Sequence, residues 1–104
     1  MRSISAEEFK EIYDKNEVLN LIDVRSIEEY KEVHVTGAVN IPLNEFSSSK
    51  LDNKKDTIYL ICRSGGRSRQ AQEKLSTEGV TNTVNVLGGT DKALVIGMKV
   101  NRSK

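Results

Sequence analysis

Hydrophobic positions along this chain fall into short runs, separated by longer stretches that mix polar and apolar residues. Three runs, VLNLIDV (18–24), TIYLIC (57–62) and TVNVL (83–87), are rich in β-branched residues and too short to form helices of their own. A weaker run, AVNIP, occupies 38–42. Such runs are typical of strands that helices cover on both sides, so we predict a buried strand at each of the three strong runs and a fourth strand at 38–42.

The spacing Ser-x-x-Glu marks the starts of two helices. At 5–8 and again at 26–29, the hydroxyl and the carboxylate can each accept from a backbone N–H group that the first helical turn leaves without a partner. We therefore expect helices to begin near Ala6 and Ile27. The first helix carries an apolar stripe of three residues, Phe9, Ile12 and Tyr13. This stripe is expected to pack on the sheet.

A third helix is predicted between the second and third strong runs. The segment 67–79 places Ala71 and Leu75 on one stripe and ends in Gly79, which suits the left-handed conformation that closes many helices. The polar segment 46–56 is expected to be a surface loop. Strands and helices thus alternate, which predicts an α/β fold with a mostly parallel sheet, helices on both faces, and ligands at the carboxyl ends of the strands.

The length, the net charge and the hydrophobic content of the chain exclude several classes of function. A chain of 104 residues fits one domain, residues 1–104. With 16 basic and 15 acidic residues, the net charge of +1 provides no overall field for binding nucleic acid or an anionic membrane. Hydrophobic residues make up 37% of the chain and occur in clusters far shorter than the ~20 residues of a membrane-spanning helix. We expect neither nucleic acid nor a membrane as a partner.

The N-terminal segment and the cysteine count bear on location. Residues 1–10 lack the apolar core of a secretory signal. Cys62 is the only cysteine, so no disulfide can form within the chain. We therefore expect the protein to reside in the cytoplasm, with its thiol reduced.

Cys62 ends the second strong run and admits two interpretations. A free cysteine at the end of a buried strand is most often a packed core residue. The sequence that follows, CRSGGRS, favours a nucleophile, because its two glycines allow backbone N–H groups to turn inward and a helix starts directly after them. Residues 62–69 contain three cations and no carboxylate, namely Arg63, Arg67 and Arg69. Each feature stabilises a thiolate, so we predict a local anion site.

Three separated motifs together resemble the single-domain rhodaneses, the thiosulfate sulfurtransferase family. The stretch LIDVRSIEEYKEVHVTGAVNIP is similar to the family's N-terminal signature, ICRSGGRS to its active-site loop, and GGT at 88–90 to the start of its C-terminal signature. The first signature is carried by Asp23, Arg25, His34, Gly37, Ala38 and Pro42. The resemblance covers nearly the whole chain and implies a rhodanese-like domain with a central, mostly parallel five-stranded sheet.

The resemblance also implies a reaction. Cys62 would take the outer sulfur of a small anionic donor, such as thiosulfate or polysulfide, and pass it to a thiol or cyanide acceptor. The loop residues implied to bind the donor are Arg63, Ser64, Gly65, Gly66, Arg67 and Ser68. Their backbone N–H groups would hold the persulfide, while Arg63 and Arg67 would hold the anionic donor. Neither a metal nor an organic cofactor is implied.

The length of the loop separates this chain from related families. The spacing from Cys62 to Arg67 is Cys-X4-Arg, whereas cysteine phosphatases and related arsenate reductases need Cys-X5-Arg, a loop wide enough for a tetrahedral oxyanion. The shorter loop resembles that of the sulfur-transferring members and argues against a phosphatase.

Other motif residues are expected to support the site. Asp23 and Arg25 follow a strand and either border the site or form a buried pair that organises the loops. His34, the only histidine, could form a Cys–His dyad, but its place in the motif favours a structural role before a strand. Gly88 and Gly89 could approach a ligand, although a strand-to-helix turn accounts for them.

Two positions depart from the family pattern. Ala93 stands where tryptophan is usual, and Lys99 stands where proline is usual. The small alanine either leaves a gap or has its space filled by Leu94, Ile96 or Met98.

Two further functions are weighed against the enzyme. One is a sulfur carrier or persulfide relay whose donor and acceptor are proteins. The other, redox sensing, is weaker, because no second cysteine can resolve a sulfenic acid within the chain.

Overall fold

A five-stranded sheet forms the centre of the computed structural model, which describes residues 1–102; positions 103 and 104 of the domain expected at 1–104 lie outside the described residues. The strands are β1 (Arg2–Ile4), β2 (Leu21–Asp23), β4 (Val39–Asn40), β5 (Ile58–Ile61) and β6 (Thr83–Val86). They lie in the order β1-β6-β5-β2-β4, and each neighbouring pair is parallel. The predicted α/β fold with a parallel five-stranded sheet is confirmed.

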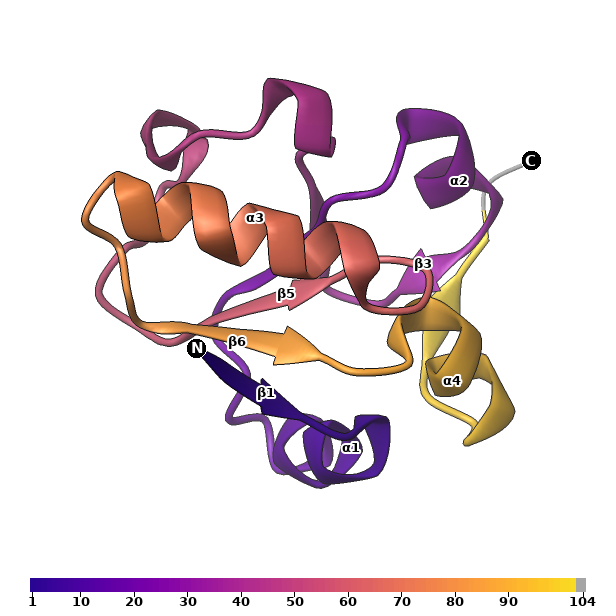
Figure 1. Ribbon diagram of the computed structural model, residues 1–104. Coiled ribbons are helices and arrows are strands. Elements are labelled where there is room, and N and C mark those ends of the chain that lie inside the picture. The colour runs from indigo at the N-terminus through magenta and orange to yellow at the C-terminus, as the bar shows by residue number, and fades with distance from the viewer. Residues whose placement is uncertain (103–104) are drawn as a thin grey trace.

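Helices cover both faces of this sheet and one of its ends. The helices are α1 (Ala6–Asp14), α2 (Ile27–Glu32), α3 (Gly66–Thr77) and α4 (Gly89–Val95), with short 3-10 turns η1 (Leu43–Glu45) and η2 (Ser48–Lys50). In Figure 1, α3 lies over one face and α1 lies under the other, while α2 and α4 lie near the end toward which β5 and β6 point. That end of the sheet holds the carboxyl ends of the strands.

Local sequence signals set the helix boundaries. Both Ser-x-x-Glu pairs form complete capping boxes, so α1 and α2 start at the predicted residues. Helix α3 ends near Gly79, which adopts the left-handed conformation at φ +85°. The Val80 N–H group donates to the Leu75 carbonyl oxygen at 2.9 Å and closes the last turn, which confirms the predicted glycine cap.

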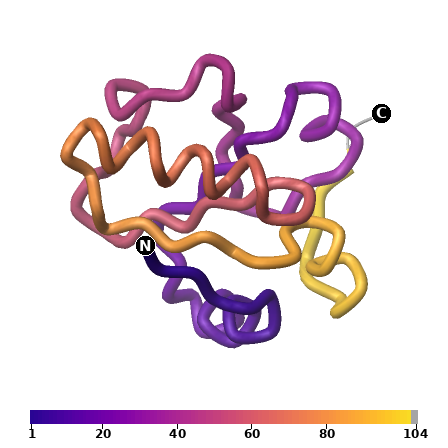
Figure 2. The backbone as a smooth tube through the Cα atoms, viewed as in Figure 1, coloured from indigo at the N-terminus to yellow at the C-terminus, as the bar shows by residue number. Residues whose placement is uncertain are grey.

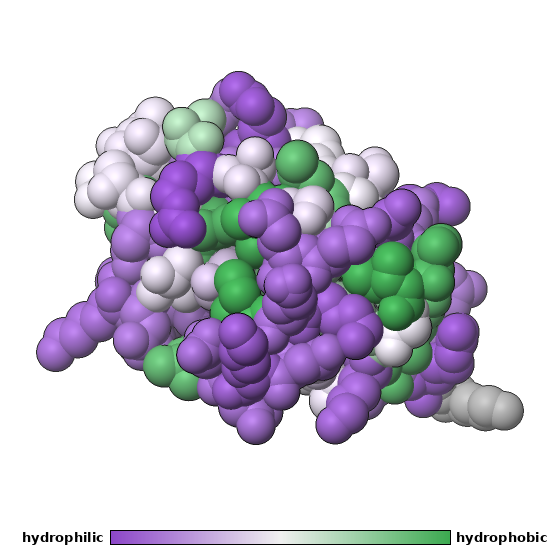
Figure 3. Space-filling model, turned by 90° about the horizontal axis from the view of Figure 1, so that it is seen from below, coloured by the Kyte–Doolittle hydropathy of each residue, from purple (hydrophilic) through white to green (hydrophobic). Residues whose placement is uncertain are grey.

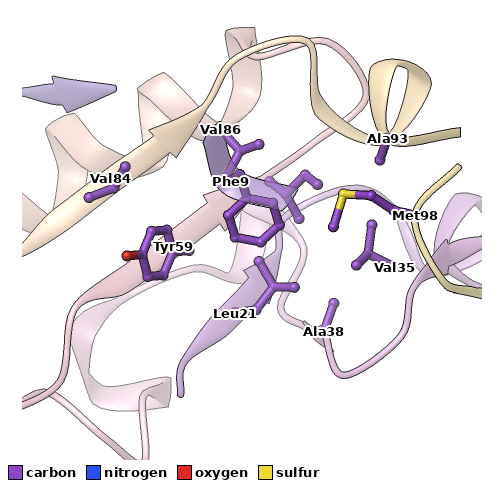
Figure 4. Packing of buried hydrophobic residues seen from close by; sticks show 10 residues of the cluster. Phe9, Leu21, Val35, Ala38, Tyr59, Val84, Val86, Ala93 and Met98 are labelled. Carbon is purple, nitrogen blue, oxygen red and sulfur yellow. The ribbon is translucent and has the colours of Figure 1, made fainter. Parts of the chain in front are cut away.

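Side chains of the central strand β5 alternate between the two faces of the sheet. Tyr59 and Ile61 belong to a cluster on the side of α1, whereas Leu60 and Cys62, the residue that follows β5, belong to a cluster on the side of α3. Figure 4 shows the first cluster, in which the ring centroids of Phe9 and Tyr59 lie 5.4 Å apart. This contact confirms that α1 packs on the sheet through its apolar stripe.

Three strands lie outside the predicted set: β1, β3 (His34–Val35) and β7 (Val100–Asn101). Strand β1 pairs in parallel with β6, and β3 pairs with β7 in a separate antiparallel sheet. Each is only two or three residues long, too short to show an apolar period. Their pairing partners, rather than their local sequence, therefore define them as strands.

The expectation of a surface loop at 46–56 is only partly correct. Phe46 is fully buried and Leu51 nearly so, both within the cluster on the side of α3. The turn η2 lies between them. The loop is therefore held to the core by two apolar anchors, which its polar composition concealed.

The face of the molecule that is seen from below in Figure 3 is predominantly polar. Figure 3 shows hydrophilic residues over most of the face seen from below, with apolar residues gathered toward its right side. Leu94 and Val95 of α4 are among the exposed apolar residues. Within residues 1–102, no helix combines the length and the apolar character that crossing a membrane requires.

Candidate active site

The segment CRSGGRS joins β5 to α3 at the carboxyl end of the sheet. Figure 2 shows it as a tight loop that lies beside the first turn of α4. Gly65, the N-cap of α3, adopts the left-handed conformation at φ +119°, which glycine tolerates at little cost. The loop thereby turns within a few residues and brings the positive end of the α3 dipole close to Cys62.

The sulfur of Cys62 lies among hydrogen-bond donors. Its Sγ accepts from the Gly65 N–H group at 3.0 Å and lies 3.4 Å from the Ser68 hydroxyl oxygen. Burial raises the pKa of the thiol, but hydrogen bonds from Ser68 and from the backbone N–H groups of Gly65 and Ser64 outweigh burial, so the pKa lies below its usual value. The residue is nevertheless only 1% exposed. Cys62 is therefore packed as a core residue and also surrounded as a thiolate would be.

The first turn of α4 fixes the backbone of this loop. Three of its N–H groups donate to three consecutive loop carbonyl oxygens: Gly88 to Ser64 (3.2 Å), Thr90 to Cys62 (2.8 Å) and Asp91 to Arg63 (3.1 Å). These carbonyl oxygens are thus occupied by α4. The loop can then present its own N–H groups to a negative charge on the sulfur without a competing dipole.

Gly89 makes this close approach possible. Its φ is +54°, and a Cβ atom there would lie 2.4 Å from the Cys62 carbonyl oxygen and 2.6 Å from that of Arg63. Both distances are far below van der Waals contact, so any side chain would force α4 away from the loop. The expected strand-to-helix turn is present at Gly88 and Gly89, but sequence reasoning missed that the turn is docked on the backbone of Cys62.

Asn85 of β6 is a site residue that sequence reasoning missed. Its Nδ2 donates to the Gly65 carbonyl oxygen at 3.1 Å, and its Oδ1 accepts from the Ser68 hydroxyl. A carbonyl oxygen can only accept, which determines the orientation of the amide. The available signal was a polar residue in the middle of the apolar run 83–87, because a buried amide normally needs specific partners.

Arg67 is not a free cation. Its Nη1 and Nη2 donate to the two carboxylate oxygens of Glu29 in α2, at 2.6 and 2.9 Å. These hydrogen bonds lower the pKa of Glu29 to about 2, against the opposing effect of burial. The absence of a carboxylate from residues 62–69 therefore does not leave Arg67 unopposed in three dimensions, because Glu29 is remote along the chain but adjacent in the fold.

The other two loop arginines also have carboxylate partners. Arg63 Nε lies 3.4 Å from Asp91 of α4, and Arg69 Nε lies 3.8 Å from Glu73 one turn further along α3. Both pairs are well exposed to solvent, so each contributes little to stability. Together with Arg67–Glu29, however, they balance every positive charge of the loop.

Asp23 and Arg25 form the buried pair that was one of the two alternatives for them. Arg25 Nε donates to Asp23 Oδ1 at 3.0 Å, and its Nη2 donates to Asp23 Oδ2 at 2.8 Å. The same Nη2 reaches the Val33 carbonyl oxygen at 2.6 Å, just after α2. The pair therefore ties the end of β2 to the end of α2 and supports the region that carries Glu29.

His34 has structural partners. Its Nδ1 lies 2.7 Å from the Tyr30 carbonyl oxygen, and its ring stacks on the Tyr30 ring at 3.7 Å between centroids. It begins β3, in agreement with the structural role expected for it. Among the contacts of residues 1–102, no hydrogen bond joins His34 to Cys62.

Ala93 lies in the core on the side of α1, at 1% exposure. Figure 4 shows Met98 next to it, and Met98 belongs to the same cluster. Of the alternatives for this position, the structure therefore supports filling by Met98, with Ile96 packed at the edge of the cluster. Leu94 points outward and does not fill the space.

Comparisons with known proteins agree with this arrangement. The sequence model of the rhodanese-like domain matches residues 5–94. The thiosulfate sulfurtransferase PspE of Escherichia coli K12 is 42% identical over 76 residues, covering 70% of this chain and 73% of PspE. YrkF of Bacillus subtilis 168, whose name proposes a sulfur-carrier role, is 44% identical over 87 residues, covering 83% of this chain. The chain spans 47% of the length of YrkF.

A solved structure has the same fold over the full length of both chains. The rhodanese-like domain protein of Staphylococcus aureus superimposes with a TM-score of 0.81 at 28% sequence identity, covering 100% of each chain.

Proposed function

Because the chain belongs to the rhodanese-like domain family, we propose that it is a sulfurtransferase that carries sulfane sulfur as a persulfide on Cys62. The observation that supports this most directly is the position of the Cys62 sulfur, which accepts from the Gly65 N–H group and lies beside the Ser68 hydroxyl. A pKa below the usual thiol value increases the fraction of the nucleophilic form near neutral pH.

The proposed reaction has two steps. The Cys62 thiolate attacks the outer sulfur of thiosulfate, the S–S bond of the donor breaks, and its electron pair leaves with sulfite, so that Cys62 becomes a persulfide anion. An acceptor such as cyanide then attacks the outer sulfur of the persulfide, which forms thiocyanate and returns the thiolate. A thiol acceptor would leave as its own persulfide in the same way. Charge and atoms balance in each step without a further reactant.

Protein groups act on the sulfur in both steps. The N–H groups of Ser64, Gly65 and Ser68 stabilise negative charge on Cys62 before the attack and again when it leaves the persulfide. Docking of α4 on the loop carbonyls holds those groups in position. Arg63 and Arg67 remain the proposed contacts for an anionic donor, within the limits that their carboxylate partners set.

A Cys62→Ser variant provides the first test. The wild-type protein treated with thiosulfate should gain the mass of one sulfur atom, and it should convert thiosulfate and cyanide to thiocyanate. The variant should do neither, because a hydroxyl cannot carry sulfane sulfur. Intact-mass spectrometry and a thiocyanate assay measure the two outcomes. A folded wild-type protein that takes up no sulfur from thiosulfate or polysulfide would falsify the proposal.

The similarity to YrkF favours a second candidate, a sulfur carrier that exchanges sulfur with proteins. Burial of Cys62 also suits a donor or acceptor that is docked before transfer. The two candidates differ in rate. A carrier should form its persulfide faster from a persulfide-bearing cysteine desulfurase than from thiosulfate at equal concentration, whereas uniformly slow transfer from protein donors would leave the enzyme as the better description.

We further propose a cytoplasmic location, in which Cys62 stays reduced between turnovers. Labelling of Cys62 in freshly lysed cells tests this, and a residue found mostly as a disulfide or an oxygen-oxidised sulfur, rather than as a thiol or persulfide, would contradict it.

A further inference from the structure

The charges that surround Cys62 cancel one another. Arg25 and the three arginines of residues 62–69 each have one carboxylate partner within 4 Å, and the pairs are Arg25–Asp23, Arg63–Asp91, Arg67–Glu29 and Arg69–Glu73. Two of these pairs, Arg63–Asp91 and Arg69–Glu73, are loose and exposed, whereas Arg67–Glu29 is bidentate and about two-thirds buried. The region therefore carries several cations but little net positive charge.

Glu29 has two roles that can be separated. Its Oε1 accepts from the Ser26 N–H group and hydroxyl, both at 3.1 Å, and so completes the capping box of α2. The same carboxylate accepts both hydrogen bonds from Arg67. Glu8 completes the matching box of α1 with Ser5, at 3.3 and 3.2 Å, but has no arginine partner among the described residues. The chain therefore contains one capping glutamate that faces the site and one that does not.

Arg67 lies in the first turn of α3, directly before Ser68, whose hydroxyl oxygen lies 3.4 Å from the Cys62 sulfur. The negative charge of the thiolate raises the pKa of Arg67, although the hydrogen bonds from Glu29 have the largest effect and Asp23 also contributes. The negative charge of Glu29 therefore acts on an anion in the same small region in which the Cys62 sulfur lies. An anion that approaches Cys62 meets Arg67 together with the carboxylate that neutralises it.

We propose that Glu29 sets the charge preference of the Cys62 site, so that sulfur donors with one negative charge are used in preference to the thiosulfate dianion. This inference rests on the proposed sulfur transfer. The physical reason is that the repulsion between Glu29 and a donor grows with the charge of the donor, whereas the attraction of Arg67 is already compensated. Removing the charge of Glu29 should therefore help a dianion more than a monoanion.

Organic thiosulfonates provide the matched donor. In R–SO2–S⁻ one oxygen of thiosulfate is replaced by carbon, so the anion carries one charge instead of two. Attack by the Cys62 thiolate on the terminal sulfur breaks the S–S bond, gives the Cys62 persulfide anion and releases the sulfinate R–SO2⁻ with the electron pair. The transferred atom and the bond that breaks are the same as with thiosulfate.

The decisive variant is Glu29→Gln, and Glu8→Gln is its control. Glutamine keeps the capping box, since its side-chain oxygen accepts from the same donors, but it removes the charge. We expect Glu29→Gln to raise kcat/KM about fivefold for benzenethiosulfonate and about 25-fold for thiosulfate, because the effect of one removed charge scales with donor charge. Glu8→Gln should change neither. Equal changes for the two donors, or the same change in the control, would overturn the inference.

A second measurement does not depend on sulfur transfer. Iodoacetate and iodoacetamide alkylate the same thiolate, but only iodoacetate is charged, so the ratio of their rates reports the local charge independently of the thiol pKa. The ratio should rise about fivefold in Glu29→Gln and stay unchanged in Glu8→Gln. In the wild type it should depend little on added salt, whereas in Glu29→Gln it should fall as salt screens the freed Arg67.

The two measurements separate the inference from the proposed function. If the ratio of the iodoacetate to the iodoacetamide rate does not respond to Glu29→Gln, the charge role of Glu29 is overturned even if sulfur transfer is confirmed. A ratio that responds in a protein that accepts no sulfur supports the charge role of Glu29, and it is then the proposed function that fails. Because the wild-type salt dependence needs no variant, a strong fall of its ratio with salt also counts against the inference.

Discussion

The Ser68 hydroxyl has one proton and three neighbouring acceptors. It lies within hydrogen-bond distance of the Gly65 carbonyl oxygen, the Asn85 Oδ1 and the Cys62 sulfur. When Cys62 carries its own proton, the Ser68 hydroxyl can donate to the Asn85 Oδ1, because the thiol can then donate to the Ser68 oxygen. When Cys62 is a thiolate, the hydroxyl is the one side chain among these that can donate to it. Ser68 should therefore matter most in the charged state of the sulfur.

A Ser68→Ala variant should raise the pKa of the Cys62 thiol, since it removes a hydrogen bond to the charged form of the sulfur. In the native protein the pKa of Cys62 is lowered, so the variant should need a higher pH to reach the same rate of alkylation. Below the pKa the rate should fall about tenfold, because a hydrogen bond to a charged group contributes at least about 1.4 kcal/mol. The measurement is the rate of iodoacetamide alkylation as a function of pH.

Ser64→Ala is the matched control for this experiment. Ser64 lies in the same loop, its side chain is exposed, and it contributes through its backbone N–H group rather than its hydroxyl. Its replacement by alanine should leave the profile in place. A profile that shifts equally in both variants would mean that the hydroxyl of Ser68 has no special role.

At the scale of elements, the site depends on how α4 meets the β5–α3 loop. The helix supplies N–H groups to the carbonyl oxygens of Cys62, Arg63 and Ser64, and the loop supplies N–H groups to the sulfur. Loop geometry is thus determined by an element that follows it by more than twenty residues. Glycine at position 89 is required because the backbones are in contact there.

Gly89→Ala tests this dependence. The new methyl group would meet the Cys62 carbonyl oxygen, so the free energy of unfolding should fall by about 3 kcal/mol and alkylation of Cys62 should slow as the loop loses its support. Gly79→Ala is the control, because Gly79 also has a positive φ but nothing lies within 4 Å of the point that its Cβ atom would occupy. It should cost about 1 kcal/mol and leave alkylation unchanged. Urea unfolding and alkylation rates would contradict this picture if the two variants behaved alike.

At the scale of the whole molecule, two apolar clusters enclose the sheet and position its carboxyl end. The cluster on the side of α1 contains Ala93 and Met98, and the cluster on the side of α3 contains Cys62 itself. The proposed nucleophile is therefore part of the core that stabilises the fold. Packing changes in either cluster are expected to reach the site through β5 and α4.

Ala93→Trp tests how completely the first cluster is filled. Met98 already occupies the space beside Ala93, so the added ring should overpack the core and lower the free energy of unfolding by about 1–3 kcal/mol. Combining it with Met98→Ala should cost less than the sum of the two single changes. Val95→Trp, on the same helix but 77% exposed, should change stability by less than about 0.5 kcal/mol. A stabilising Ala93→Trp variant would show instead that a cavity remains there.

The sequence by itself determined the parts of this protein that depend on neighbours along the chain. The apolar runs at 18–24, 57–62 and 83–87 predicted the central strands, because a strand buried on both faces is apolar at most of its positions. The Ser-x-x-Glu pairs and Gly79 predicted helix ends, because capping is a contact within one turn. CRSGGRS predicted the loop around Cys62 for the same reason.

Only the tertiary structure decided which residues from distant parts of the sequence contact that loop. Glu29 neutralises Arg67, Asn85 holds Ser68 and Gly65, and Gly89 docks α4 on the backbone of Cys62. Each partner is far from the loop in sequence, and no local period or cap specifies it. Strands β1, β3 and β7 were missed for a related reason, since they are defined by pairing rather than by composition. The hydrogen bonds to Cys62 thus come largely from its own loop, whereas the charges around it are set by the fold.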